Sequence, residues 1–305
     1  MSFASETKNE ICKIMPQNSC CQKAECYGLL LFAKNFSLHA ITLTTENTAV
    51  AHRAAQLAAQ TTQNYVDLAT ALSHHATHKS AYIITVAGED QRKSVLSYFG
   101  YTGKEISLRI NRANMEDECC ESAFLRGAFL SCGTVTNPEK DYHLEFVIPF
   151  LNLARDFMTL LSESYALDLQ PALVNRKGSY VVYIKGSERI ADLLTYVGAP
   201  NAAMELMQVK MVKEVRNYVN RKTNFETANI DKTVSAAAKQ VAALEKIMKG
   251  AGIESLPEEL RELASLRYEN PELSLRELGE SLSEPISRSG VNHRLQRIIE
   301  LAENL

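Results

Sequence analysis

The sequence predicts an α+β region built from two similar halves, followed by an all-α domain. Three observations support this fold class. The first two-thirds of the chain repeats itself after about one hundred residues. Each copy alternates apolar helices with β-rich runs, which is the order of an α+β fold. From Leu256 onward, prolines and capping residues divide the chain into three helices.

The composition is typical of a globular protein with two or three domains. Of the 305 residues, 46% are hydrophobic and 23% are charged, so a sizeable core is available. No apolar run approaches the roughly 18 residues that a membrane helix needs, and the start MSFASETKNE is unlike a signal peptide. Seven cysteines without such a signal predict free thiols in a reducing cytosol.

The repeat is visible in two pairs of segments. CCQKAECYGLLLF at 20–32 aligns with CCESAFLRGAFLS at 119–131. AYIITVAGEDQRKSVLSYFG at 81–100 aligns with SYVVYIKGSERIADLLTYVG at 179–198. We therefore expect each copy to form the same unit of helices and strands.

The elements of this unit follow from the apolar pattern of each copy. We expect a first helix at about 22–33 and 120–131, a strand at 38–44 and 142–147, a second helix at 48–62 and 150–164, and a closing helix at 89–99 and 187–197. Two β-rich runs precede the closing helix. In the second copy, NRKG joins these runs and predicts a hairpin turn with Gly178 at positive φ.

The first helix of each copy carries a glycine in its middle. The helix at 120–131 is apolar almost all the way round, so it must be buried. A central glycine costs roughly 1 kcal/mol relative to alanine, which indicates that another backbone approaches closely. We expect Gly28 and Gly127 to meet where the two helices pack side by side in a pseudo-twofold domain.

LRGAFLSCG at 125–133 resembles the LAGLIDADG helix of homing endonucleases, and CYGLLLFAK at 26–34 resembles a degenerate second copy. The resemblance implies two antiparallel sheets that form a saddle over DNA, and two helices that each end in a metal-binding acid. Those acidic positions fall here on Ala33 and Cys132, with Lys34 beside the first. Because Mg²⁺ requires oxygen ligands, we predict no catalytic residue and no nuclease activity.

The paired cysteines allow two interpretations. Cys20 and Cys21 recur as Cys119 and Cys120, so a soft-metal site between facing helices is conceivable. Adjacent cysteines rarely chelate one ion well, however, and the repeat alone explains the pairs. We expect no metal and no cofactor, and we expect Cys132 to be a small buried helix residue.

Charge is distributed in blocks. Residues 206–249 carry nine Lys/Arg against four Asp/Glu, and residues 250–284 carry three against nine. The first block predicts phosphate contacts from Lys210, Lys213, Arg216, Arg221 and Lys222. The alternative is a pair of interdomain helices joined by a polar turn, with solvated charges and Asn side chains that cap and bridge the turn.

The last helices have the pattern of a helix-turn-helix. Ser274 and Glu277 form a capping box, Ser287 caps a longer basic helix, and Gly279 allows a close crossing. The final helix has one apolar face and a polar face opposite. We expect the final helix to enter the major groove of double-stranded DNA. Contacts with DNA are expected from both helices and their caps: Ser274, Arg276, Ser287, Arg288, Ser289, Asn292, His293, Arg294, Gln296 and Arg297. The alternative is a generic three-helix bundle.

The chain as a whole resembles the bacterial sporulation regulator WhiA family, most specifically in NRKTNFETANIDKTV and SLRELGESLSEPISRSGVNHRLQRI. This resemblance implies a cytoplasmic, nucleoid-associated DNA-binding regulator involved in cell division, chromosome segregation and sporulation. It also implies that the LAGLIDADG-like domain contacts DNA or other regulatory or cell-division proteins; we favour proteins, since residues 1–204 carry 18 Lys/Arg against 20 Asp/Glu. A thiol- or metal-responsive regulator and an active endonuclease are the alternatives.

The resemblance also suggests how the chain is divided. We expect an N-terminal segment at 1–19 and a degenerate LAGLIDADG-like domain at 20–204, with repeats at about 20–104 and 119–200. A basic helical connector at 205–250 and a helix-turn-helix domain at 251–305 would follow.

Overall fold

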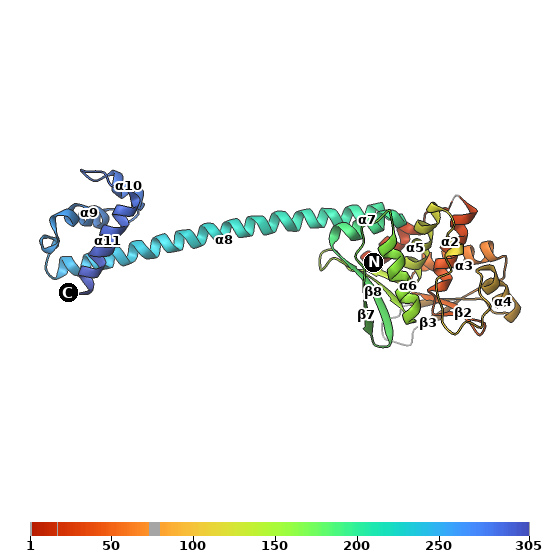
Figure 1. The fold of residues 1–305 in the computed structure, drawn as a ribbon. Helices are drawn as coiled ribbons and strands as arrows, with labels where there is room; N and C mark the ends of the chain where they lie inside the picture. Colours follow the sequence, from red (N-terminus) through yellow and green to blue (C-terminus); the bar gives the residue numbers. More distant parts are fainter. Residues whose placement is uncertain (1, 17, 73–79, 305) are drawn as a thin grey trace. The chain divides into compact units, whose positions relative to one another are not determined.

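The computed structural model describes residues 2–16, 18–72 and 80–304. The chain separates into two units, Met1–Lys213 and Glu214–Leu305. The first contains helices and two antiparallel sheets, and the second is helical (Figure 1). The predicted fold class is therefore confirmed. No helix in the described part of the chain is both long and apolar enough to cross a membrane.

The two repeats have the same order of elements. The first contains α2 (Ser19–Leu31), β1 (Asn35–Phe36), β2 (Ile41–Thr45), α3 (Thr48–Thr62), β3 (Asp67–Leu72), β4 (Ser80–Thr85) and α4 (Glu89–Tyr98). The second contains α5 (Glu118–Cys132), β5 (Gly133–Val135), β6 (His143–Ile148), α6 (Leu151–Glu163), β7 (Ala172–Arg176), β8 (Ser179–Lys185) and α7 (Ser187–Val197). The sheets have orders β1-β2-β4-β3 and β5-β6-β8-β7. The same topology in both sheets confirms the predicted duplication.

The turn between β7 and β8 has the predicted conformation. Lys177 and Gly178 have φ values of 50° and 83°, and Arg176 pairs with Ser179 across the hairpin. A two-residue turn with both φ values positive matches the twist of the strands that it joins.

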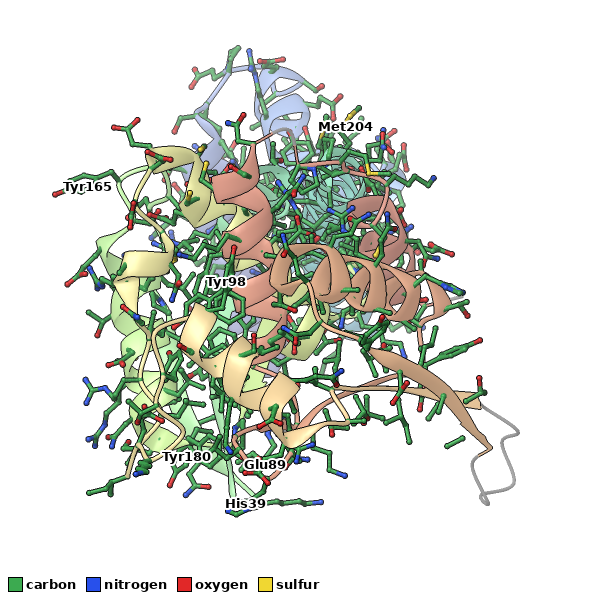
Figure 2. The ribbon with its side chains drawn as sticks, turned by 90° about the vertical axis from the view of Figure 1, so that its right-hand side faces the viewer. His39, Glu89, Tyr98, Tyr165, Tyr180 and Met204 are labelled. Carbon is green, nitrogen blue, oxygen red and sulfur yellow. The ribbon has the colours of Figure 1, made fainter. Side chains whose placement is uncertain are left out.

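Some aromatic side chains of the first unit lie on its surface. Tyr165, which follows α6, is fully exposed and projects outward (Figure 2). Tyr98, at the end of α4, is 44% exposed, and the ammonium of Lys23 lies 5.5 Å from its ring centroid. These rings contribute little to the core and remain available to solvent.

The central glycines lie in the contact between α2 and α5. A Cβ atom added to Gly28 would overlap the carbonyl oxygen of Phe124, and one added to Gly127 would overlap that of Glu25. Each glycine therefore lets the opposite backbone approach more closely than any side chain would allow. This confirms the predicted packing of the two helices.

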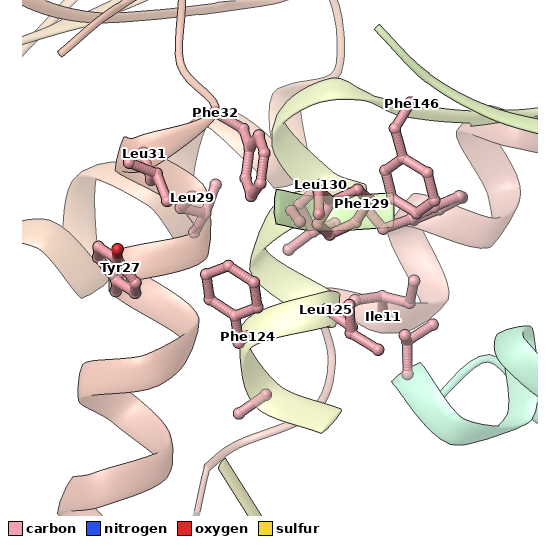
Figure 3. Close-up of a cluster of buried hydrophobic side chains, with 14 of the residues drawn as sticks. Ile11, Tyr27, Leu29, Leu31, Phe32, Phe124, Leu125, Phe129, Leu130 and Phe146 are labelled. Carbon is pink, nitrogen blue, oxygen red and sulfur yellow. The ribbon is translucent and has the colours of Figure 1, made fainter. Parts of the chain in front are cut away.

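The core of the first unit surrounds this helix pair. Figure 3 shows Tyr27 and Leu29 of α2, and the following Phe32, beside Phe124 of α5. The ring centroids of Tyr27 and Phe124 are 5.4 Å apart, and those of Phe32 and Phe157 are 4.9 Å apart. The first pair is tilted and the second is edge-on, and these contacts join the two repeats into one core.

Sequence analysis missed the N-terminal helix α1 (Phe3–Ile11). Its residues were predicted to form a segment outside the domain, but Phe3, Thr7 and Ile11 are buried in the core of the first unit. A nine-residue helix with only three buried positions gives a weak periodic signal, which explains the omission.

Helix α8 covers Pro200–Lys249 without interruption, and its residues from Glu214 onward belong to the second unit. The alternative of two helices joined by a polar turn is therefore wrong. No glycine or proline occurs between Pro200 and Gly250, and the Asn and Thr residues in this stretch cost only tenths of a kcal/mol each in a helix. The predicted limits of the basic connector, 205–250, remain predictions.

The second unit continues with η2 (Ile253–Ser255), α9 (Glu258–Glu269), α10 (Leu275–Glu280) and α11 (Arg288–Glu303). Figure 1 labels these last three helices near the C-terminus. Their core is a single apolar cluster that includes the end of α8: Leu244, Ile247, Leu256, Leu260, Leu263, Ala264, Leu278, Leu282, Val291, Leu295, Ile298 and Ala302.

Candidate nucleic-acid interface

The helices α10 and α11 both begin with a serine cap. The amide of Gly290 donates to Ser287 Oγ over 3.2 Å. At α10 the amide of Glu277 donates to Ser274 Oγ, and the amide of Ser274 donates to Glu277 Oε2 over 2.8 Å. That backbone hydrogen bond holds the pKa of Glu277 below its usual range. The predicted capping box and cap are confirmed.

The turn between these helices is tight because Gly279 has no side chain. Its carbonyl accepts a hydrogen bond from the amide of Ile286 over 3.1 Å. A Cβ atom on Gly279 would lie 2.5 Å from the Ile286 carbonyl oxygen. Glu262 of α9 accepts hydrogen bonds from both the amide and the hydroxyl of Ser283, at 2.6 and 2.8 Å. These contacts fix the path of the chain between the two helices.

Helix α11 separates its apolar and polar faces as the sequence predicts. Val291, Leu295 and Ile298 are buried. The polar positions predicted to face DNA are exposed: Arg288, Ser289, Asn292, His293, Gln296 and Arg297. Arg294 is half-buried. The helix has no acidic residue in its first turn, so its positive N-terminal end lacks a nearby carboxylate within the helix.

Three of the predicted DNA-contacting arginines have partners within the chain. Arg297 pairs with Glu259 over 2.6 Å, and Arg276 pairs with Glu280 over 2.8 Å. Arg294 donates to the carbonyl of Glu259 over 3.2 Å. Both ion pairs are solvent-exposed, and such pairs contribute at most about 1 kcal/mol to the free energy of unfolding. A phosphate could therefore displace the carboxylate from Arg276 or Arg297 at small cost.

A pocket of about 440 Å³ unites residues from α8, α9, α10 and α11. Four of the predicted contacts line it, namely Ser274, Arg276, Arg288 and Asn292, and Lys232, Thr233, Ala236, Gln240, Arg267 and Leu275 complete it. The lining thus contains four cationic residues and no carboxylate. Positive charge and hydrogen-bond donors thus gather around the start of α11.

Arg267 lies at the base of this pocket and was missed by sequence analysis. It is only 2% exposed. Its Nε donates to Gln240 Oε1 over 2.8 Å, and its Nη1 donates to the carbonyl of Leu273 over 2.5 Å. Burial lowers the pKa of Arg267, while the charge of Glu272 acts in the opposite direction. The nearest partners of this buried cation are neutral, so an anion in the pocket would stabilise it.

The basic residues at 210–222 divide into two groups. Lys210 pairs with Glu188 over 2.6 Å, and this contact holds the pKa of Glu188 below its usual range. The amine of Lys213 donates to the carbonyl of Pro138 over 2.7 Å. Both lysines belong to the first unit and have partners within it, whereas Arg216, Arg221 and Lys222 are exposed. Their predicted contacts with phosphate remain predictions.

The helix ends that would carry metal-binding acids in the LAGLIDADG pattern do not suit a divalent cation. Ala33 is buried, and burial raises the pKa of Cys132 to about 12. The amine of Lys8, from α1, donates to the carbonyl of Leu130 over 3.0 Å. Burial lowers the pKa of Lys8 to about 8. An amine therefore caps the end of α5, and these residues offer a divalent cation no carboxylate oxygen.

Glu25 is a second residue that sequence analysis missed. It is fully buried on α2 and accepts hydrogen bonds from Arg53 Nε and Nη2 over 2.9 to 3.1 Å. Arg126 of α5 reaches the other side of the carboxylate over 3.2 Å and also donates to the carbonyl of Val197. Its signal in the sequence was a single acid just before the apolar run CYGLLL. This network joins the two repeats through buried ion pairs.

The four paired cysteines lie together at the starts of α2 and α5. The Sγ atoms of Cys20, Cys21, Cys119 and Cys120 all lie within 4.8 Å of one another. The sequence left open whether these residues converge, and the structure brings them to one place.

Family comparisons agree with this architecture. The family model described as WhiA LAGLIDADG-like domain matches residues 121–216. The one described as WhiA C-terminal HTH domain matches residues 219–302. Together they cover more than half of the chain.

Similar proteins align over almost the full length. "Probable cell division protein WhiA" of Alkaliphilus metalliredigens is 37% identical over 313 residues, which cover 99% of this chain and 98% of the relative. The protein of the same name from Clostridium botulinum strain Hall is 38% identical over 317 residues, covering 100% and 99%. The crystal structure of full-length DUF199/WhiA from Thermatoga maritima has 26% identity and a TM-score of 0.61, covering 100% of this chain and 99% of that one. The chain belongs to the WhiA family.

Proposed function

We propose that this protein is a sequence-specific DNA-binding transcriptional regulator that acts in cell division. The pocket at the start of α11 carries the proposal, because four predicted DNA-contacting residues line it together with Lys232 and Arg267. A buried guanidinium with neutral partners, surrounded by further cations, suits the oxygen atoms of a phosphodiester.

In this proposal the N-terminal half of α11 enters the major groove. Arg288, Asn292 and His293 are exposed there and are suited to donate to or accept from base edges. Ser289, Gln296 and Arg297 extend the same face. Arg294 is half-buried and holds the helix against α9, so we assign it to positioning or to the phosphate backbone. Phosphates would be bound by Lys232, Arg267 and Arg276.

The serine caps have a different role. Ser274 and Ser287 use their hydroxyl oxygens to accept helix amides. Their hydroxyl hydrogens remain able to donate to a phosphate oxygen at the same time. We assign both residues to contacts with the DNA backbone, which place α10 and α11 on the duplex without reading its sequence.

The LAGLIDADG-like domain is proposed to act as an interaction module and not as a nuclease. Lys8 at the end of α5 and the absence of a carboxylate at Ala33 and Cys132 support this view. Residues 1–204 carry 18 Lys/Arg against 20 Asp/Glu, a balance that favours a protein partner over DNA. Other regulatory or cell-division proteins are the candidates.

The cellular process that we propose rests on membership of the WhiA family. We place the protein in the cytoplasm at the nucleoid, in control of cell division and chromosome segregation, with a role in sporulation in sporulating relatives. The relatives named as probable cell division proteins support the first of these.

The test uses binding of the full chain to duplex DNA at several salt concentrations. Arg288→Ala should weaken binding at least about tenfold, because a base or phosphate contact is lost. Arg155→Ala, which removes the same charge from an exposed position on α6, serves as the matched control. Equal affinities for the two variants would contradict the proposed interface. Incubation of supercoiled DNA with Mg²⁺ or Mn²⁺ should leave it intact, and cutting would contradict the non-enzymatic role.

A further inference from the structure

The starts of α2 and α5 place four thiols around one point. Cys20 and Cys21 lie in the first turn of α2, and Cys119 and Cys120 in the first turn of α5. The Sγ atoms of Cys20 and Cys119 are 3.8 Å apart, and all four Sγ atoms lie within 4.8 Å of one another. Two adjacent pairs from different repeats thus converge, although neither pair alone could surround an ion.

This spacing corresponds to a tetrahedral tetrathiolate site. Zn²⁺ binds cysteine sulfur at about 2.3 Å, which places the sulfurs of a tetrahedron about 3.8 Å apart. The Cys20 and Cys119 sulfurs already have this separation. The remaining separations, none above 4.8 Å, need only small side-chain rotations to match. Four thiolates in this geometry favour zinc among the divalent ions.

The N-terminal ends of two helices converge on the four sulfurs. The positive ends of two helices meet at the sulfurs, and helix N-termini stabilise negative charge. Neither N-cap residue, Asn18 or Asp117, uses its side chain to cap its helix. The first-turn amides of both helices are therefore left without side-chain acceptors and can face the charge of a bound tetrathiolate.

The site has a path from solvent. Cys119 is exposed and Cys120 is buried, so one ligand lies at the entrance and one on the inner side. A pocket of about 700 Å³ is lined by Glu116, Asp117, Glu118 and Glu121, which flank Cys119 and Cys120 in the sequence, together with Arg112, Glu163 and Tyr165. Arg112 pairs with Glu163, and the other carboxylates raise the local concentration of divalent cations.

We propose that Cys20, Cys21, Cys119 and Cys120 bind one Zn²⁺ ion that clamps the two repeats together at the starts of α2 and α5. Binding replaces thiol protons, which pass to solvent, by four metal–sulfur bonds. No redox change is involved. The ion is structural, because four protein ligands leave no open position for a substrate.

The test is Co²⁺ binding to the reduced, metal-free full chain, followed by competition with Zn²⁺. Tetrahedral thiolate coordination gives Co²⁺ an intense sulfur-to-metal charge-transfer band and strong d–d bands in the red. We expect this spectrum to saturate at about one ion per chain and to disappear when Zn²⁺ is added. A spectrum without the thiolate band, or no binding, would overturn the proposal.

Paired variants identify the ligands. Cys20→Ser with Cys119→Ser removes one ligand from each repeat and should weaken Co²⁺ binding by well over about tenfold. Cys12→Ser with Cys132→Ser removes two cysteines outside the cluster and should leave the spectrum unchanged. Equal spectra for the two double variants would also overturn the proposal.

A measurement on the unaltered chain covers the case in which a variant unfolds. Zn²⁺ should raise the Tm of the metal-free protein, since a ligand that binds only the native state stabilises it. It should also protect Cys20, Cys21 and Cys119 from alkylation while leaving the alkylation of Cys12 unchanged. The same Tm and the same alkylation rates with and without Zn²⁺ would contradict the site.

Discussion

The guanidinium of Arg267 is buried against Gln240, with 2.8 Å between Nε and Oε1. A glutamine satisfies the hydrogen-bonding capacity of this donor without neutralising its charge. The cation therefore keeps its charge at the base of a pocket that Lys232, Arg276 and Arg288 also line. An anion that enters this pocket gains a charge-assisted hydrogen bond. This bond is stronger than the same contact at the exposed surface, where water screens the charges.

Lys232 provides the first prediction, because we assign it to the phosphate backbone and not to bases. Lys232→Ala should weaken binding to all duplexes by a similar factor. It should also reduce the slope of log affinity against log salt by about 0.9, the value for one released counterion. Fluorescence anisotropy with two unrelated duplexes measures both effects. An unchanged slope would show that Lys232 does not contact the DNA backbone.

Glu25 provides a prediction for the stability of the first unit. Glu25→Gln leaves the buried guanidinium of Arg53 and that of Arg126 without a counter-charge. Removing one partner of a buried pair costs about 3–5 kcal/mol of unfolding free energy, and we expect a loss in this range in urea denaturation.

The matched control for Glu25 is Glu163→Gln. Glu163 pairs with Arg112 over 2.6 Å but is 55% exposed, so its loss should cost less than about 1 kcal/mol. Similar losses for the two variants would show that the Glu25 network does not stabilise the junction of the repeats.

The buried amine of Lys8 should make the stability of the first unit depend on pH. Its pKa is about 8 in the folded protein and 10.5 when unperturbed. Below pH 8 both states are protonated, and the buried charge opposes folding by up to about 3 kcal/mol. Between these two pKa values the unfolded state binds more protons, so this contribution to stability rises with pH.

The variant Lys8→Met isolates this effect from other groups. Burial raises the pKa of Cys12 to about 11 and that of Cys132 to about 12. The unfolded thiols ionise first, so these groups lower stability as pH rises above their unperturbed pKa. Lys8 lowers the pKa of both thiols, so its loss raises them further and makes the variant lose slightly more stability at high pH, in the same direction as the expected difference. The stability of Lys8→Met minus that of the parent should therefore be larger near pH 7 than near pH 10. A difference independent of pH would contradict the burial of the amine.

Much of the fold could be predicted because repeats, helix caps and apolar periodicity depend on residues that are close in the sequence. The repeated cysteines and glycines revealed the duplication, the cap at Ser274 follows from its spacing to Glu277, and that at Ser287 from the serine that precedes the basic helix. The short strands β1 and β5 were missed because two or three residues give no periodic signal. The supposed turn inside α8 was wrong because polar residues alone do not end a helix.

The sites were harder to predict than the elements. Arg267, Gln240 and Lys232 come from helices α9 and α8, and only tertiary packing places them beside Arg288. In the first unit, Lys8 reaches Leu130 from 122 residues away. No spacing rule connects such residues, since their contact depends on how the helices pack.

Sequence reading by α11 is tested most directly by selection of random duplexes with the full chain, followed by affinity measurements on the enriched sequence. We expect one sequence to be enriched, and we expect the double variant Asn292→Ala with His293→Ala to lose most of the preference. It should still bind DNA non-specifically, because the phosphate contacts remain. Enrichment of no sequence, or a preference that survives in the double variant, would contradict sequence reading by α11.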